Sequence, residues 1–402
     1  MQRFLKRYAA FFRQPDVVRL LVVVLAARMP IGMMSFALLM HLRALSGSFA
    51  FAGGAVGTYL VAMACSAPII GRIVDRRGPR GVLIVLGIAQ PILLGLILFA
   101  DPLLLPLTVI APLVALTGAC APPISTVTRT LWRHRFDDDE DRRTAFAIDT
   151  VMIEFNFTVG PALIALILLV GTPQAALAVT WVFVSTAVPL FLLSPAPRYF
   201  RISRDEERHL LGPLTEPRLL LVYATAAALT FMFGMIEVGY PGFATGLGEP
   251  ALGGVLIACC SIGSALGGFA YGGMHFSVSV ERQLSRFLLA MVLPLAAQAW
   301  VASVALFALL AFACGLLIAP SLTALTLLVT RRAPERYATE AFTWLSTCVV
   351  TGIGAGMAAG GQLVELAGPW SAFAVAAGAC LVATVLSISL RSRSPTRQPR
   401  RL

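Results

Sequence analysis

The sequence is poor in charge and contains a single lysine. Only 13% of its 402 residues are charged and 58% are hydrophobic, whereas a soluble domain usually carries about 25% charged residues. The one lysine, Lys6, stands near the N-terminus, so the sequence has no phosphate-binding loop of the form Gly-x-x-x-x-Gly-Lys-Ser/Thr. The absence of that loop excludes a self-contained ATP-driven pump.

Other motifs that carry chemistry are also missing. The sequence has no His-Glu-x-x-His, no paired-cysteine zinc pattern and no Gly-x-Ser-x-Gly turn. Its seven cysteines follow no pairing pattern, and most stand in apolar runs, as small buried hydrophobic residues do. The acidic run at 137–141 is flanked by arginines, which favours a solvated connection over a metal loop. We therefore expect no enzyme activity, no metal site and no cofactor.

Long uncharged runs account for the scarcity of charge. Val82 to Ala100 and Ala162 to Leu193 contain stretches of ~20 apolar residues, enough to cross ~30 Å of hydrocarbon. The first apolar run is longer than a secretory signal, and no small-residue cleavage site follows it. The sequence thus predicts an all-α polytopic membrane protein with about twelve spans. We place them at 17–40, 49–70, 81–100, 105–129, 144–170, 173–193, 218–242, 250–271, 284–302, 304–330, 341–363 and 370–390.

The basic residues alternate between successive loops. Arginines crowd the second, fourth, central and tenth connections and the C-terminal tail, while the loops between them carry almost none, with Arg43 the exception. This alternation is the positive-inside pattern, which predicts an inner (cytoplasmic) membrane protein with both termini and the central loop in the cytoplasm. The net charge of +11 therefore indicates topology and contact with anionic lipid headgroups rather than nucleic acid. We expect the chain to be a monomer.

The two halves of the sequence resemble each other. Gly32-Met33 is matched by Gly234-Met235, the run from Ala121 by the run from Ala319, and Gly53-Gly54 by Gly253-Gly254, all at offsets near 200 residues. The pattern predicts a six-helix unit used twice: residues 1–193, a cytoplasmic central loop at 194–217, and residues 218–402. Parallel repeats of this kind are typical of two-lobed secondary transporters with a site near the midplane.

The loop between the second and third predicted spans carries a recognisable motif. Its residues Gly71, Asp75, Arg76, Gly78 and Arg80 resemble the Gly-x-x-x-Asp-Arg-x-Gly-Arg-Arg loop of the major facilitator superfamily, with Pro79 departing from the pattern. The resemblance covers the whole chain through span count, repeat and topology. It implies a twelve-helix transporter with a cytoplasmic latch that would use Asp75, Arg76 and Arg129, the last at the inner end of the fourth span. The N-terminus of the eleventh span, near Glu340, offers Asp75 a positive helix end as well. The chemistry agrees, because an acid in a basic loop needs a partner, and Gly71 would let two helices approach closely.

A second feature resembles the efflux, drug:proton antiporter-like branch of that superfamily. Gly160-Pro161 lies in the fifth span, but Asn156 and Ile164-Ala165 replace glycines of the longer pattern, and no arginine occurs between Leu107 and Cys120. A kink with close helix packing explains Gly160 and Pro161 equally well.

Four ionisable residues stand out inside the predicted spans, where each such group costs ~2.5–3.5 kcal/mol to insert. Arg28 lies ~16 Å into the first span, beside Pro30, which we expect to break the helix. Asp149 and Glu154 lie five positions apart in the fifth span, so they point ~140° apart and at most one faces a central cavity. Glu237 lies in the outer part of the seventh span. Asn156 is a polar candidate at mid-span depth.

These residues lead to the first functional hypothesis. Arg28 balances a carboxylate or binds an anionic group, while Glu154 or Glu237 carries a coupling proton, because burial favours reversible protonation of a carboxylate. The competing interpretation is a permanent ion pair between Arg28 and an acid that holds the first and fifth spans together. For Asp149 we favour structural pairing with loop arginines.

Three functions remain at this stage. The leading hypothesis is proton-coupled efflux of small apolar or amphipathic molecules by alternating access, with protons and membrane lipids as the other partners. The second is transport of a specific polar or anionic metabolite, with Arg28 as the anion-binding group. The third is a membrane receptor without transport activity or a lipid-handling protein, which the lack of any sizeable soluble domain disfavours as a receptor.

Overall fold

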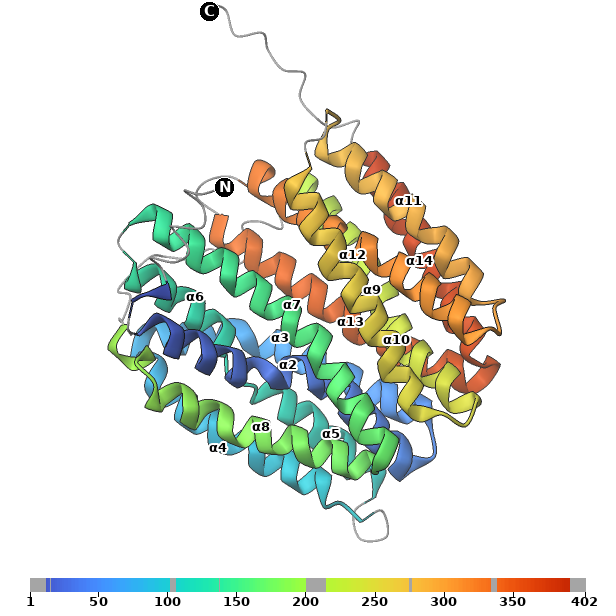
Figure 1. Cartoon of the computed structure of the whole chain (residues 1–402), viewed down its shortest axis with the longest axis horizontal. Coiled ribbons are helices and arrows are strands. Elements are labelled where there is room, and N and C mark those ends of the chain that lie inside the picture. The colour runs from blue at the N-terminus through green and yellow to red at the C-terminus, as the bar shows by residue number, and fades with distance from the viewer. Residues whose placement is uncertain are drawn as a thin grey trace, which may run out of the picture. The chain divides into compact units, whose positions relative to one another are not determined.

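The computed structural model describes residues 12–14, 16–101, 106–136, 138–199, 215–274, 277–333 and 338–390, and their regular structure is entirely helical (Figure 1). The elements in chain order are α2 (Val17–Ser46), α3 (Phe49–Arg77), α4 (Pro79–Leu98), α5 (Leu107–Ala119), α6 (Ile124–Arg135), α7 (Asp139–Val170), α8 (Pro173–Leu193), the 3₁₀ turn η1 (Ala196–Tyr199), α9 (Pro217–Gly246), α10 (Pro250–Gly273), α11 (Val280–Gln298), α12 (Val304–Arg332), α13 (Ala338–Ala367) and α14 (Pro369–Ser389).

Eleven stretches of the described chain are long and apolar enough to cross a membrane, the broken pair α5 and α6 counting as one. The ninth predicted span, at 284–302, corresponds to α11, which is not among these eleven and whose first two turns carry Glu281, Arg282 and Arg286. Those charges make this 19-residue helix more polar than its neighbours. The all-helical polytopic fold is therefore confirmed, and α11 differs from the other spans in its apolar length.

Prolines interrupt the helices at a different place from the one that the sequence predicts. Helix α2 continues through Pro30 without a break, because a single proline removes only one backbone donor and a membrane helix can absorb that loss. The predicted fourth span, at 105–129, is broken instead. Helix α5 ends at Ala119 and α6 begins at Ile124, since the consecutive Pro122 and Pro123 remove two donors and their rings exclude a regular helix.

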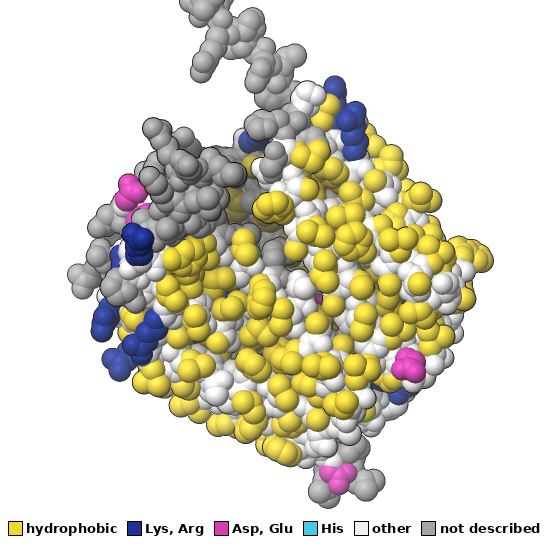
Figure 2. Space-filling model, in the orientation of Figure 1, with side chains coloured by type: hydrophobic (Ala, Val, Ile, Leu, Met, Phe, Trp, Pro, Cys, Tyr) yellow, Lys and Arg dark blue, Asp and Glu magenta, His cyan; other side chains and the backbone are white. Residues whose placement is uncertain are grey.

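The chain divides into two compact units, each of which is described on its own. Unit 1 contains 1–206 and 240–258, and unit 2 contains 207–239 and 259–402. The division falls inside the predicted central loop, although the segment 240–258 of α9 and α10 groups with unit 1. Hydrophobic side chains cover much of the described surface in Figure 2, while most of the arginines in view stand near the edge of the picture. A lipid-facing surface has this composition.

Unit 1 is held together by helix crossings around α2. The largest interfaces join α2 to α8 and to α7, and α3 to α5. Apolar residues from α2, α4, α6, α7 and α8 form one buried cluster around Trp132. In unit 2, α11 packs against both α14 and α12, and Ser387 of α14 donates a hydrogen bond to Ser285 of α11 at 2.8 Å.

The internal repeat appears as two matched pairs of close crossings. In unit 1, a Cβ on Gly118 would overlap the carbonyl of Tyr59, and in unit 2 a Cβ on Gly315 would overlap the carbonyl of Cys260. Only glycine allows the backbones to approach so closely. The two pairs stand about 200 residues apart, as the repeat predicts.

The second matched pair joins the first and fifth helices of each half. Gly32 of α2 packs against Gly160 and the Asn156 carbonyl of α7. Gly234 of α9 packs in the same way against Gly356 and the Ile353 carbonyl of α13. These crossings place the polar residues of α2 and α7 within reach of one another.

Candidate functional site

Arg28 is the most deeply buried charged residue that the structure describes, with a side chain 0% exposed. Its position on the α2 face that meets α7 follows from the Gly32 crossing one turn further along the helix. The guanidinium donates from Nη1 to Asp149 Oδ1 at 2.7 Å and from Nη2 to the Ser125 carbonyl at 3.2 Å. Its Nε has no hydrogen-bond partner. Arg28 therefore ties α2 to both α6 and α7.

The Asp149 carboxylate has two further partners. Trp132 of α6 donates its indole N–H to Oδ1 at 3.1 Å, and Arg129 Nε lies 3.7 Å from Oδ2. The Asp149 side chain is only 2% exposed, whereas that of Arg129 is 60% exposed. Two arginines and one indole N–H thus surround this carboxylate. The site contains the ion pair between the first and fifth spans that the sequence offered as one interpretation of Arg28.

The periodicity of α7 explains which acid forms this pair. Asp149, Asn156 and Gly160 follow one another at helical spacings of seven and four residues, so they share the face that packs on α2. Glu154, ~140° away around the helix, lies on another face. The side chain of Glu154 is outside the part that the structure describes. Asp149 therefore faces α2, as expected if the two acids of this span point in different directions.

Asn156 is buried two turns beyond Asp149 on the same face. Its side chain is 1% exposed, and neither amide atom has a hydrogen-bond partner. An unsatisfied buried amide costs about 1–3 kcal/mol. Because an unpaired buried amide destabilises the fold, we expect Asn156 to have a functional role such as binding a ligand.

Glu237 of α9 lies in unit 2 and has a different environment. Its side chain is partly exposed, and no hydrogen bond or ion pair joins its carboxylate to another described residue. In the repeat, Arg28 and Asp149 correspond to Thr230 and Leu345. Unit 2 therefore has no counterpart of the buried ion pair at these positions.

The residues of the loop motif are only partly described. Gly78 joins α3 to α4 with φ +81°, a conformation that favours glycine, and Arg76 and Arg80 are exposed. The close helix approach expected at Gly71 is not found, because no atom lies within 4 Å of the place of its Cβ. The side chains of Asp75 and Glu340 lie outside the described residues. The described ion-pair partner of Arg129 is Asp149.

The Gly160-Pro161 element has a packing role. Helix α7 continues through Pro161, and Gly160 is the residue that allows α7 to touch the backbone of α2 at Gly32. Close packing is sufficient to account for this element, so it gives no separate support for an efflux function.

An ionic cluster that the sequence did not predict lies at the start of α2. Arg135 donates two hydrogen bonds to Asp16, at 2.7 and 2.8 Å, and one to Gln14 at 2.8 Å. Tyr199 of η1 donates its hydroxyl to the same carboxylate. These hydrogen bonds, chiefly those from Arg135, hold the pKa of the Asp16 carboxyl well below its usual range. The cluster joins the start of α2, the end of α6 and the η1 turn.

Unit 2 contains a related contact. Arg332, at the end of α12, donates to Glu281 of α11 and to the Leu390 carbonyl, both at 3.1 Å. Arg135 and Arg332 occupy near-equivalent positions of the repeat, about 200 residues apart. That recurrence was visible in the sequence and was the one signal that could have identified both clusters.

Across the described ranges, no group of three or more His, Cys, Asp or Glu side chains could hold a metal ion. All seven cysteines are free thiols. The polar chemistry of the described chain therefore consists of charged and hydrogen-bonding side chains set among membrane-spanning helices.

A long helical chain with an internal repeat and a few charges buried between its helices is typical of a secondary transporter. The sequence profile of the Major Facilitator Superfamily matches residues 20–348. The chain belongs to this superfamily, and it is a transporter rather than an enzyme.

Two similar solved structures have the same fold. The nucleoside transporter NupG matches with a TM-score of 0.75 at 13% identity, over 94% of this chain and 99% of that one. A point mutant of NupG matches with a TM-score of 0.76 at 12% identity, over 93% and 99% of the two chains. No curated protein sequence gives a match. At these identities the likeness shows the fold alone.

Proposed function

We propose that this transporter couples proton movement to the transport of a small, neutral, polar solute, and that Glu237 carries the proton. The observation that supports this assignment is the contrast between two intramembrane acids. Asp149 is buried and bound by two arginines and an indole, whereas Glu237 has no such partner among the described residues. A carboxylate that must gain and lose a proton needs access and no permanent counter-ion.

The ion pair has a different role in this proposal. Arg28 and Asp149 remain joined throughout the cycle and hold α2 against α7. A buried pair of this geometry is hard to open, because either partner alone would be an uncompensated charge in a low-dielectric environment. The alternative in which Arg28 binds an anionic metabolite is less well supported, since its Nη1 and Nη2 groups are already bound to Asp149 and Ser125.

The choice of a neutral polar solute rests on Asn156. Its unpartnered amide offers one acceptor and two donor hydrogens, which suits a solute that carries both kinds of group. Nucleosides have that chemistry, and two solved structures of the same fold are of a nucleoside transporter. Uridine is therefore the first solute to test. Efflux of apolar molecules, the leading hypothesis from the sequence, loses its support because Gly160 is explained by packing.

Gating by the loop motif remains part of the proposal. We infer that Asp75, Arg76, Arg80 and Glu340 act at the cytoplasmic ends of the helices, as the sequence motif implies. Arg129 would join them indirectly, through its 3.7 Å contact with Asp149. The inner-membrane location and the cytoplasmic termini are proposed on the distribution of arginines in the sequence.

The experiment uses purified protein in liposomes with an imposed proton gradient. We expect the gradient to drive accumulation of labelled uridine, and a protonophore to abolish it. Glu237→Gln, which imitates the protonated acid, should lose gradient-driven accumulation and keep uridine exchange without a gradient. Gradient-driven accumulation by Glu237→Gln at the wild-type level would refute the assignment. Failure with uridine but success with an amphipathic dye would restore the efflux hypothesis.

A further inference from the structure

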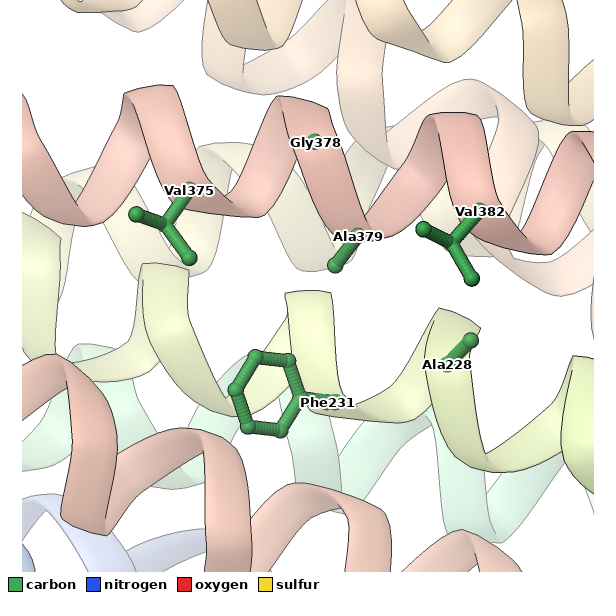
Figure 3. Close-up of a pocket in the computed structure, with 6 residues that line it drawn as sticks. All are labelled: Ala228, Phe231, Val375, Gly378, Ala379 and Val382. Atoms are coloured by element: carbon green, nitrogen blue, oxygen red, sulfur yellow. The ribbon is translucent and has the colours of Figure 1, made fainter.

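Helices α9 and α14 border an apolar hollow of about 550 Å³ (Figure 3). Ala228 and Phe231 of α9 face Val375, Gly378, Ala379 and Val382 of α14, and no lining side chain can form a hydrogen bond. All six residues belong to unit 2. The volume is in the range of small-molecule sites, about 300–1,000 Å³, but the lining has none of the polar groups that orient a soluble ligand. The chemistry favours an aliphatic occupant.

The hollow is a wedge that closes at one end. At that end, a Cβ on Gly239 would lie 2.8 Å from the ring of Phe373, so α9 and α14 are in close contact there. Toward the N-terminal end of α9 and the C-terminal end of α14, the side chains of Leu220, Ala224 and Val385 are exposed. An occupant would therefore enter from the end at which α9 begins.

The depth of the wedge matches one leaflet of a bilayer. Arg218 stands in the first turn of α9 and is exposed. Phe231 lies thirteen positions after Arg218, which is ~20 Å along a helix. Half of the hydrocarbon core is ~15 Å thick. A hydrocarbon chain that begins near Arg218 and follows α9 would reach Phe231 close to the middle of the membrane.

We propose that the wedge between α9 and α14 binds one acyl chain of an anionic phospholipid whose headgroup lies against Arg218. The apolar lining fits a hydrocarbon chain, the open end fits its direction of entry, and the exposed arginine complements a negative headgroup. A helix of a second copy of this protein, about 10 Å in diameter with its side chains, fits a narrowing wedge less well than a flexible chain.

Gly378 provides a sharp variant for the test. No atom lies within 4 Å of the position that a Cβ would take at Gly378. Gly378→Leu therefore fills the wedge without forcing neighbouring side chains or backbone to move. Gly272 of α10 also has open space at its Cβ, and Gly272→Leu is the matched control. Ala379→Leu is a second filling variant should Gly378→Leu fail to fold. Arg218→Gln tests the headgroup contact separately from the chain.

Native mass spectrometry would count bound phospholipid on the purified full chain after titration with phosphatidylglycerol or phosphatidylcholine. We expect the wild type and Gly272→Leu to retain one lipid and to prefer phosphatidylglycerol by about fivefold, the effect of one cation near an anionic surface. Gly378→Leu should lose this lipid, and Arg218→Gln should keep a lipid without the preference.

Two outcomes would overturn the proposal. One is equal lipid retention by the wild type, Gly378→Leu and Ala379→Leu. The other is a wild-type dimer that the filling variants convert to a monomer with no change in bound lipid, which would make a second copy the occupant. Neither result depends on the transported solute, so this proposal and the transport proposal can fail independently.

Discussion

Arg28 of α2 donates a 2.7 Å hydrogen bond to Asp149 of α7, and both side chains are almost completely buried. The pair joins segments 121 positions apart in the sequence. Its position next to the Gly32–Gly160 crossing makes it part of the joint between the first and fifth helices of unit 1.

Breaking this pair on one side should destabilise the protein more than removing both partners. Arg28→Met leaves Asp149 buried without its main counter-ion, and losses of about 3–5 kcal/mol are typical of such changes. We expect Arg28→Met to lower the melting temperature in detergent strongly. The double variant Arg28→Met/Asp149→Leu should recover part of the loss, and a double variant no more stable than Arg28→Met would contradict a structural pair.

Acid should remove the contribution of Asp16. Its pKa in the folded state lies below the ordinary value of 3.8, so the stabilisation is complete above that ordinary value and is lost as the pH falls through the lower, folded-state value. We expect Asp16→Asn to cost about 1.5–3 kcal/mol near neutral pH, as for hydrogen bonds to a charged group. The difference in melting temperature from the wild type should shrink below about pH 4, and a constant difference down to about pH 2 would argue against it.

The matched glycine crossings should be equally intolerant of a methyl group. Gly118→Ala and Gly315→Ala each place a Cβ on a carbonyl of the facing helix. Overpacking of this kind costs about 1–3 kcal/mol, so both variants should melt earlier than the wild type. Gly272→Ala, which meets no atom, should be neutral or slightly stabilising. Equal melting temperatures for all three variants would show that the crossings can relax.

A substitution at Asn156 should affect transport and stability differently. Because its amide has no partner, Asn156→Leu should leave the melting temperature unchanged or raise it, since an unsatisfied buried polar group is removed. The same change should raise the KM for a neutral polar solute about 10-fold or more, the loss expected for one hydrogen bond of about 1.4 kcal/mol. A lower melting temperature with an unchanged KM would assign Asn156 a packing role.

Element positions could be predicted from the sequence where local signals are strong. The sixth span was predicted at 173–193 and α8 occupies the same range, because Thr172 caps the helix and Pro173 suits its first turn. The break between α5 and α6 was missed, since two prolines in an apolar run resemble a continuous span when hydropathy alone is considered. Pro30 was expected to interrupt α2 and does not.

The residues of the site could be predicted from the sequence, but their contacts remained open. Arg28, Asp149 and Asn156 were identified because polar groups in apolar runs are costly. An ion pair between Arg28 and an acid of the fifth span was one interpretation of the sequence. The sequence could not decide between that pair and the other interpretations, because the partners come from separate helices and depend on how those helices cross. The cluster of Asp16, Arg135 and Tyr199 was missed for another reason. Its charges lie near helix ends, where arginines are expected on topological grounds alone.

The paired crossings also limit how the two halves can diverge. At Gly118 and Gly315 the facing surface is backbone, which every residue shares. The partner residues, Tyr59 and Cys260, can therefore differ completely while the joint stays the same. The same crossing can therefore carry different side-chain chemistry in each half: the pair of Arg28 and Asp149 lies beside the Gly32–Gly160 crossing in unit 1, and the equivalent positions of unit 2 hold Thr230 and Leu345.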